Sequence, residues 1–246
     1  MALVTGASSG LGRRFARVLA ASGAKVALAA RRMDRLEDLA GEIGAAGGEA
    51  AAVVMDVTDE ASIIAGFDAA EARFGPVDTV IANAGMNSRG LATEVSAAEF
   101  DQVMAINVRG VFLTAREGAR RMIAAGSRES GRGRVILVSS IGAVKVLPGL
   151  TAYCASKAAV AMMGKSLARE WANRGVNVNV VCPGYVKTEL NAEWFGEEGG
   201  KKQIAGFPRQ RLMAEEDLDA MIAHLASDAS RAVTGSVFTL DDGQTL

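Results

Sequence analysis

A chain of 246 residues with a formal net charge of -1 has no excess of positive charge that would attract nucleic acid or an anionic membrane. With 50% hydrophobic and 22% charged residues it has the composition of a globular domain, and it is long enough to bury its own core without a metal or disulfide staple. Two cysteines form no disulfide framework, and no apolar run reaches the roughly 20 residues of a membrane helix. We therefore expect a cytoplasmic protein whose partner is a small molecule, with no nucleic acid and no membrane.

In the first half of the chain, short apolar runs alternate with stretches of helical periodicity. The apolar runs predict four strands, at Ala2–Val4, Lys25–Ala30, Glu49–Met55 and Val77–Ala82. Helices are expected after the first three of them, ending at Gly23, spanning Leu36 to Ile43, and covering residues 59–74.

The second half continues the alternation, with helices near 96–106 and 108–125, a strand at Arg134–Ser139, a helix at about 152–173, a strand at Val176–Val181, a helix at about 214–227 and a strand at 236–240. The strands are near-continuous apolar runs, so we expect both of their faces to be covered. The pattern predicts one α/β domain over residues 1–246, a Rossmann-type doubly wound parallel sheet of about seven strands with helices on both faces. The polar, glycine-rich stretch 188–208 is expected to form a substrate lid.

The turn after the first strand has the sequence Thr5-Gly6-Ala7-Ser8-Ser9-Gly10-Leu11-Gly12. A glycine turn between a strand and a helix presents backbone N–H groups and the positive end of the helix dipole to an anion. Gly6 would permit the tight turn, Gly10 the approach of a pyrophosphate, and Gly12 close packing of helix on strand. Such a turn can also be purely structural, but its place at the first strand of an alternating chain favours a dinucleotide site.

The end of the second strand bears on which dinucleotide binds. An acidic side chain there binds the ribose 2′-hydroxyl of NAD, whereas a nearby arginine favours the 2′-phosphate of NADP. Here Ala30 is followed by Arg31 and Arg32, and a guanidinium can direct two donors at a phosphate. NADP(H) is therefore favoured, and NAD(H) stays possible, since both arginines could instead pair with Asp34 or Glu37.

Three residues in the second half have the chemistry of a proton-transfer site. Tyr153 and Lys157 are four residues apart on the long helix and so share one face. A lysine ammonium beside a tyrosine is expected to lower the tyrosine pKa, which suits general acid and base chemistry on a carbonyl/alcohol couple. Ser140 follows the fifth strand, at the edge where parallel sheets bind ligands. Each residue taken singly also has a structural explanation, as a chance helix pair or a cap.

Together these residues carry a resemblance: the chain is similar to members of the short-chain dehydrogenase/reductase family over nearly its whole length. The matching motifs are Thr5-Gly6-x-x-x-Gly10-x-Gly12, Asp56-Val57, Asn83-Ala84-Gly85, Asn107, Ser140, Tyr153-Cys154-Ala155-Ser156-Lys157 and Pro183-Gly184. The interval to Tyr153 selects Ser140 over Ser139. One departure is Ala82, where the family usually has another asparagine.

The resemblance implies a catalytic role for four residues. Tyr153 would donate the proton to the substrate oxygen while the nicotinamide delivers hydride to the carbon. Lys157 would lower the pKa of Tyr153 and bind the nicotinamide ribose. Ser140 would orient the carbonyl, and Asn107 would hold a water that links Lys157 to solvent.

The resemblance also implies a set of cofactor-binding residues. Ser8, Ser9, Gly10, Leu11 and the rest of the glycine turn would hold the pyrophosphate. Near the adenine and its ribose we expect Asp56, Val57, Asn83, Ala84 and Gly85. Near the nicotinamide we expect Tyr153, Lys157, Pro183, Gly184, Val186 and Thr188.

The implied activity is hydride transfer between NADPH and a ketone or secondary alcohol. Leu91, Val144, Trp194 and other apolar side chains in the expected pocket favour a 3-oxoacyl thioester or another apolar ketone, although Arg89, Lys145 and Arg209 could bind an anionic tail. The alternatives are a polyol or sugar-acid dehydrogenase of the same family and, in a different class, a non-catalytic dinucleotide sensor.

The resemblance further implies a homotetramer or homodimer. No metal is expected, because the chain has one histidine, His224, and no cluster of acidic ligands around it.

Overall fold

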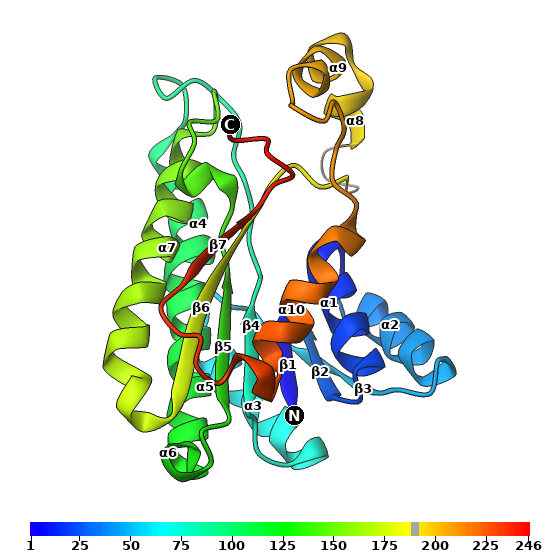
Figure 1. Ribbon diagram of the computed structural model, residues 1–246, viewed down its shortest axis with the longest axis vertical. Helices are drawn as coiled ribbons and strands as arrows, with labels where there is room; N and C mark the ends of the chain where they lie inside the picture. Colours follow the sequence, from blue (N-terminus) through cyan, green and yellow to red (C-terminus); the bar gives the residue numbers. More distant parts are fainter. Residues whose placement is uncertain (188–191) are drawn as a thin grey trace.

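The structure is a computed structural model that describes residues 1–187 and 192–246. Seven strands form one parallel sheet in the order β3-β2-β1-β4-β5-β6-β7 (Figure 1). Their bounds are β1 Ala2–Thr5, β2 Lys25–Ala30, β3 Glu49–Val54, β4 Thr79–Ala82, β5 Gly133–Val138, β6 Val176–Pro183 and β7 Val237–Leu240. This confirms the doubly wound parallel sheet of seven strands.

The helices of the described residues alternate with these strands. They are α1 Gly10–Ala21, α2 Met33–Ala45, α3 Glu60–Phe74, α4 Ala97–Met104, α5 Val111–Ala124, α6 Ser127–Ser130, α7 Thr151–Trp171, α8 Ala192–Gly196, α9 Glu198–Ala205 and α10 Asp219–Ala226. Shorter turns are the π-helical η1 Ala105–Gly110 and the 3-10 turns η2 Ile141–Ala143, η3 Ala172–Arg174, η4 Glu215–Leu218 and η5 Asp228–Ser230.

Both faces of the sheet are covered, as the apolar strands predicted. Successive side chains of a strand point to opposite faces. Leu3 packs in the core beneath α3, α5 and α7, whereas its neighbours Ala2 and Val4 pack in the core beneath α1, α2 and α10. Figure 1 shows the two layers on either side of the sheet.

The expected helices near 96–106 and 108–125 are joined in the structure. The π-helical turn η1 links α4 directly to α5. Gly110 lies against Val57 within this turn: a Cβ at position 110 would lie 2.9 Å from Val57 Cγ2. The close approach brings the π turn against the segment that follows β3, so tertiary packing accounts for a feature that periodicity does not show.

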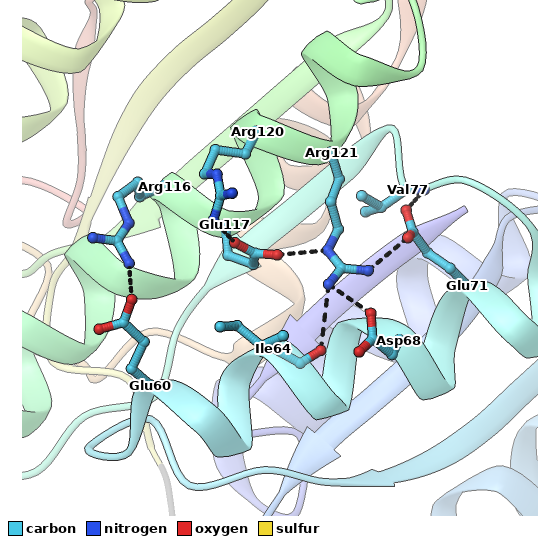
Figure 2. Close-up of polar contacts among 9 residues, drawn as sticks. All are labelled: Glu60, Ile64, Asp68, Glu71, Val77, Arg116, Glu117, Arg120 and Arg121. Carbon is cyan, nitrogen blue, oxygen red and sulfur yellow. Dashed lines mark hydrogen bonds and ion pairs between the residues drawn. The ribbon is translucent and has the colours of Figure 1, made fainter.

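A charged network fastens α5 to α3 (Figure 2). The Arg121 guanidinium donates to Asp68 and Glu71 on α3, both at 2.7 Å, and to Glu117 on its own helix at 2.8 Å. Glu71 in turn accepts from the backbone N–H of Val77, at 3.1 Å. The network therefore fixes the segment that leads into β4, one of the strands that end at the site.

Two short helices, α8 and α9, extend beyond the edge at which the strands end (Figure 1). They belong to the stretch 188–208 that we expected to be a lid. Residues 188–191 of that stretch lie outside the described residues.

Candidate active site

The glycine-rich turn has the conformation that its sequence predicted. Gly6 and Gly10 have positive φ angles of 68° and 51°, which favour glycine. A Cβ on Gly12 would lie 2.3 Å from the carbonyl oxygen of Gly6, so α1 can pack here only with glycine. A Cβ on Gly10 would meet nothing within 4 Å. The N-terminus of α1 therefore faces open space at Gly10, as a pyrophosphate site requires.

Thr5 joins the ends of β1 and β4. Its hydroxyl accepts from the backbone N–H groups of Asn83 and Ala84, at 3.0 and 3.1 Å. The Asn83 side chain donates to the Thr5 carbonyl at 3.0 Å and lies against Gly6 and Gly12. Asn83 thus packs against the glycine turn and supports its conformation. Sequence reasoning missed the role of Thr5 in joining the two strands.

Arg32 reaches the glycine turn. Its guanidinium donates to the hydroxyls of Ser8 and Ser9, at 2.9 and 3.2 Å. Among the residues that the structure describes, no ion pair joins Arg31 or Arg32 to an acid, so the expected alternative, pairing with Asp34 or Glu37, does not occur. The charge of Arg32 is directed at the anion site.

Asp56 and Val57 follow β3 at the same edge. The Asp56 carboxylate accepts from the backbone N–H and the hydroxyl of Thr58, at 2.9 and 2.8 Å. These hydrogen bonds lower the pKa of Asp56, and the charge of Arg31 adds to them. Asp56 is therefore ionised and held in place beside the end of β2.

Lys157 is the buried cation of the site. It is 4% exposed, and its ammonium donates to the Val138 carbonyl at 2.9 Å. Burial lowers the pKa of Lys157 to about 8. Its Nζ lies 5.6 Å from the centre of the Tyr153 ring, so the two side chains meet as their spacing on α7 predicted.

The pKa of Tyr153 moves in the direction opposite to the one we expected. Burial of the phenol raises it, and a hydrogen bond with the Ser140 hydroxyl opposes this rise. The sequence predicts instead that the charge of Lys157 lowers the pKa of Tyr153. The correction has a physical cause: desolvation penalises the phenolate more than its neighbours stabilise it.

Ser140 faces Tyr153 and Ser139 does not. The Ser139 hydroxyl donates to the Lys157 carbonyl at 2.7 Å, which commits it to the backbone of α7. The Ser140 hydroxyl accepts from Gly142 N at 3.1 Å and hydrogen-bonds Tyr153. The geometry therefore agrees with the choice of Ser140 over Ser139.

Asn107 lies in the π turn and is fully buried. Its amide both accepts from and donates to the backbone of Met86, at 2.8 Å in each case, and donates to the Ser156 hydroxyl at 3.0 Å. A Cβ on Gly85 would lie 3.4 Å from Asn107 Oδ1 and 3.5 Å from Lys157 Nζ. Gly85 thus leaves room beside both polar groups.

The C-terminal segment supports the Pro183-Gly184 turn through Gln244. Gln244 is 2% exposed, and its side-chain oxygen accepts from Tyr185 N at 2.6 Å. Its side-chain nitrogen donates to the Tyr185 carbonyl at 3.3 Å. Sequence reasoning missed Gln244, because the contact spans 59 residues. Val186 forms a β-bridge with Met213, and Thr188 lies outside the described residues.

Aromatic side chains join the main body to α8 and to the segment after α9. The Tyr185 ring lies 5.4 Å from Phe195, edge to face, and 5.7 Å from Phe207, stacked. The Arg89 guanidinium lies 4.2 Å from the centre of the Trp194 ring. Trp194 in turn donates to Gln203 Oε1 at 3.0 Å.

Neither a metal centre nor a membrane segment emerges from the described ranges, 1–187 and 192–246. No group of three histidine, cysteine or acidic side chains there could hold a metal ion. No helix there is both long and apolar enough to span a membrane. The side chains present favour proton transfer at the carboxyl edge of the sheet, next to a site for an anionic nucleotide.

Comparison with known proteins points the same way. A family model described as short chain dehydrogenase matches residues 1–199. A D-threitol dehydrogenase of Mycolicibacterium smegmatis is 36% identical over 100% of this chain and 93% of its own length. A gluconate 5-dehydrogenase of Gluconobacter oxydans is 35% identical over 100% of this chain and 94% of its own.

A solved structure extends the likeness to three dimensions. The gluconate 5-dehydrogenase of Burkholderia cenocepacia, in complex with NADP and tartrate, matches with a TM-score of 0.92 at 32% identity. The match covers 99% of this chain and 94% of that chain. With a family model over most of its length and such relatives along all of it, this chain belongs to the short-chain dehydrogenase/reductase family of oxidoreductases.

Proposed function

We propose that this oxidoreductase prefers NADP and interconverts a secondary alcohol and a ketone, with Tyr153 as general acid and base. The observation that carries the proposal is the meeting of Ser140, Tyr153 and Lys157 where β5 and α7 come together. Ser140 hydrogen-bonds Tyr153, and Lys157 Nζ lies 5.6 Å from the Tyr153 ring. A non-catalytic sensor would have no need for a buried lysine beside this phenol.

The residues present fit a nicotinamide dinucleotide. The space beyond Gly10 would admit the pyrophosphate, and Arg32, held by Ser8 and Ser9, would bind the 2′-phosphate of NADP. Asp56 would lie at the adenine, and Lys157 at the nicotinamide ribose. When bound, the cofactor supplies or accepts the hydride. The NADP in the Burkholderia relative supports the preference, and NAD remains the alternative.

Proton transfer falls to Tyr153. Because burial raises its pKa, its hydroxyl is protonated at neutral pH and can give its proton to a ketone oxygen. In the direction of alcohol oxidation the same oxygen must start as the phenolate, which accepts the alcohol proton as the hydride leaves. Lys157, with a pKa of about 8, is mostly protonated at pH 7, and its positive charge compensates the phenolate left behind. Ser140 holds the substrate oxygen next to Tyr153.

The substrate class follows from the relatives more than from the pocket. Relatives named for D-threitol and gluconate support a polyol or sugar acid, the alternative that the sequence left open, over a 3-oxoacyl thioester. Leu91 and Val144, two of the apolar side chains that favoured an acyl chain, are each 62% exposed, so they do not enclose an apolar pocket. We therefore propose oxidation of a hydroxylated substrate.

The test is a panel of alditols, aldonates and 3-hydroxyacyl thioesters with NADP and with NAD, read by the absorbance of the reduced nicotinamide. The proposal expects turnover of hydroxylated substrates, faster with NADP. Turnover of none of the panel with either dinucleotide would contradict the enzyme assignment.

We further infer a homotetramer or homodimer in the cytoplasm, with residues 188–208 acting as a substrate lid. Met162 on α7 and Phe100 on α4 are 62% and 42% exposed, and large apolar side chains exposed on neighbouring helices support a subunit interface. The contacts of Tyr185 with Phe195 and Phe207 support the lid. Sedimentation equilibrium measures the number of subunits, and a monomer would contradict the inference.

A further inference from the structure

We propose that Arg89 binds a carboxylate of the substrate, so that the substrate is a sugar acid and not a neutral polyol. This inference rests on the proposed dehydrogenase function and narrows its substrate class. It comes from comparing three cations, Arg89, Lys145 and Arg209, which belong to the segments that the sequence predicts around the substrate.

Two of the three cations already have partners. The Lys145 ammonium donates to the Gln244 carbonyl at 2.6 Å. Arg209 pairs with Asp242, with Nε and Oδ1 3.1 Å apart. Arg89 has neither an acidic partner nor a hydrogen bond from its guanidinium within the part of the chain that the structure describes. It is the cation of the three whose donors are free for a ligand.

Arg89 is nevertheless held in position. The next residue, Gly90, donates from its backbone N–H to the Gly149 carbonyl at 3.0 Å. A Cβ on Gly149 would lie 3.9 Å from Arg89 Cγ, so the arginine stem runs along this glycine. The guanidinium then stacks on Trp194 of α8. Stacking uses the flat face of the guanidinium and leaves the N–H groups at its edge, which match the two oxygens of a carboxylate.

Tyr185 connects Arg89 with Tyr153, the residue proposed to transfer the proton. Burial raises the pKa of Tyr185, whereas a hydrogen bond with Gln203 and the positive charge of Arg89 lower it. The Arg89 guanidinium is therefore close enough to the Tyr185 hydroxyl to stabilise its anionic form. Tyr185 and Tyr153 pack against the same small cluster of Ile141, Leu147 and Leu150. In this proposal a substrate with its hydroxyl at Tyr153 would extend past Tyr185 toward Arg89.

Polar groups beside Tyr185 suit the other hydroxyls of such a substrate. Gln203 accepts from the Trp194 indole and hydrogen-bonds Tyr185, so phenol, amide and indole form one connected set. The indole of this set belongs to Trp194 of α8, the same residue whose ring lies beneath the Arg89 guanidinium. Recognition of a carboxylate at Arg89 would therefore join the acid end of the substrate to α8.

The test uses Arg89→Gln and a matched control, Arg209→Gln. The substrates are an aldonate and the alditol of the same carbon number, assayed with NADP. Arg89→Gln is expected to raise KM for the aldonate by about 10- to 100-fold, the range for a charge-assisted hydrogen bond, and to leave the alditol unchanged. Arg209→Gln should change neither KM, because its charge is paired with Asp242 and Arg211 also pairs with that carboxylate.

Two results separate failure of this inference from failure of the proposed function. Equal losses on aldonate and alditol, or a wild-type enzyme that does not prefer the aldonate, would overturn the role of Arg89 and leave the dehydrogenase intact. No turnover of any alcohol would overturn the dehydrogenase itself. In that case calorimetric titration of the wild type and Arg89→Gln with aldonate still decides the inference, since binding at Arg89 requires weaker affinity in the variant.

Discussion

Replacement of Lys157 by methionine should stabilise the fold while it abolishes activity. The burial that lowers the pKa of Lys157 from 10.5 to about 8 corresponds to about 3 kcal/mol of unfavourable free energy for the protonated folded state. Methionine removes this penalty and also the hydrogen bond to Val138, which contributes about 1–2 kcal/mol. The expected net gain at pH 7 is about 1–2 kcal/mol.

The difference in unfolding free energy between Lys157→Met and the wild type should depend on pH. The unfolded chain holds the Lys157 proton up to pH 10.5, whereas the folded protein releases it above about pH 8. The unfolded state therefore binds more protons between these values, and the stability of the wild type rises with pH across this window. The advantage of the methionine variant should shrink over the same window and be lost by about pH 10.5.

Urea unfolding at pH 7 and at pH 10, at one protein concentration, measures the difference. Lys165→Met is the control, because Lys165 lies on the same helix and is exposed. Lys165→Met measures, at each pH, what the loss of an exposed lysine on this helix does to stability by itself. A Lys157→Met variant less stable than the wild type at pH 7, or a difference that stays constant with pH, would refute the reasoning.

Two further predictions concern the cofactor and the C-terminal segment. Replacing Arg31 and Arg32 by alanine should raise the Kd for NADPH by about 10-fold or more and leave that for NADH nearly unchanged, in a fluorescence titration; equal losses would contradict binding of the 2′-phosphate. Gln244→Ala should lower the free energy of unfolding by about 1–3 kcal/mol, because it leaves the buried backbone groups of Tyr185 without their partners. Unchanged stability in urea would show that these hydrogen bonds do not hold the turn.

Much of the fold was predictable because the strands are short apolar runs that a parallel sheet buries on both faces. The helix boundaries that were predicted incorrectly depend on contacts between residues far apart in the sequence. Periodicity places a break between 106 and 108, but Gly110 packs on Val57 and the helix continues through a π turn. The expected helix at 214–227 starts as the 3-10 turn η4 and becomes α-helical at Asp219.

The candidate site was predictable where residues are close in sequence or share a motif. Tyr153 and Lys157 meet because helix geometry places positions four apart on one face. The support given by Thr5 and Gln244 was not predictable, because their partners lie 78 and 59 residues away. The pKa of Tyr153 was expected in the wrong direction, because the burial that raises it is a property of the folded chain and cannot be seen in the sequence.

The most direct test of the account is the turnover of Tyr153→Phe measured beside its affinity for NADPH. Phenylalanine keeps the ring but removes the proton donor, so the rate should fall by about 100-fold or more while NADPH binding is retained. A variant that reduces its ketone at close to the wild-type rate would contradict the role of the Tyr153 hydroxyl and, with it, the proposed chemistry.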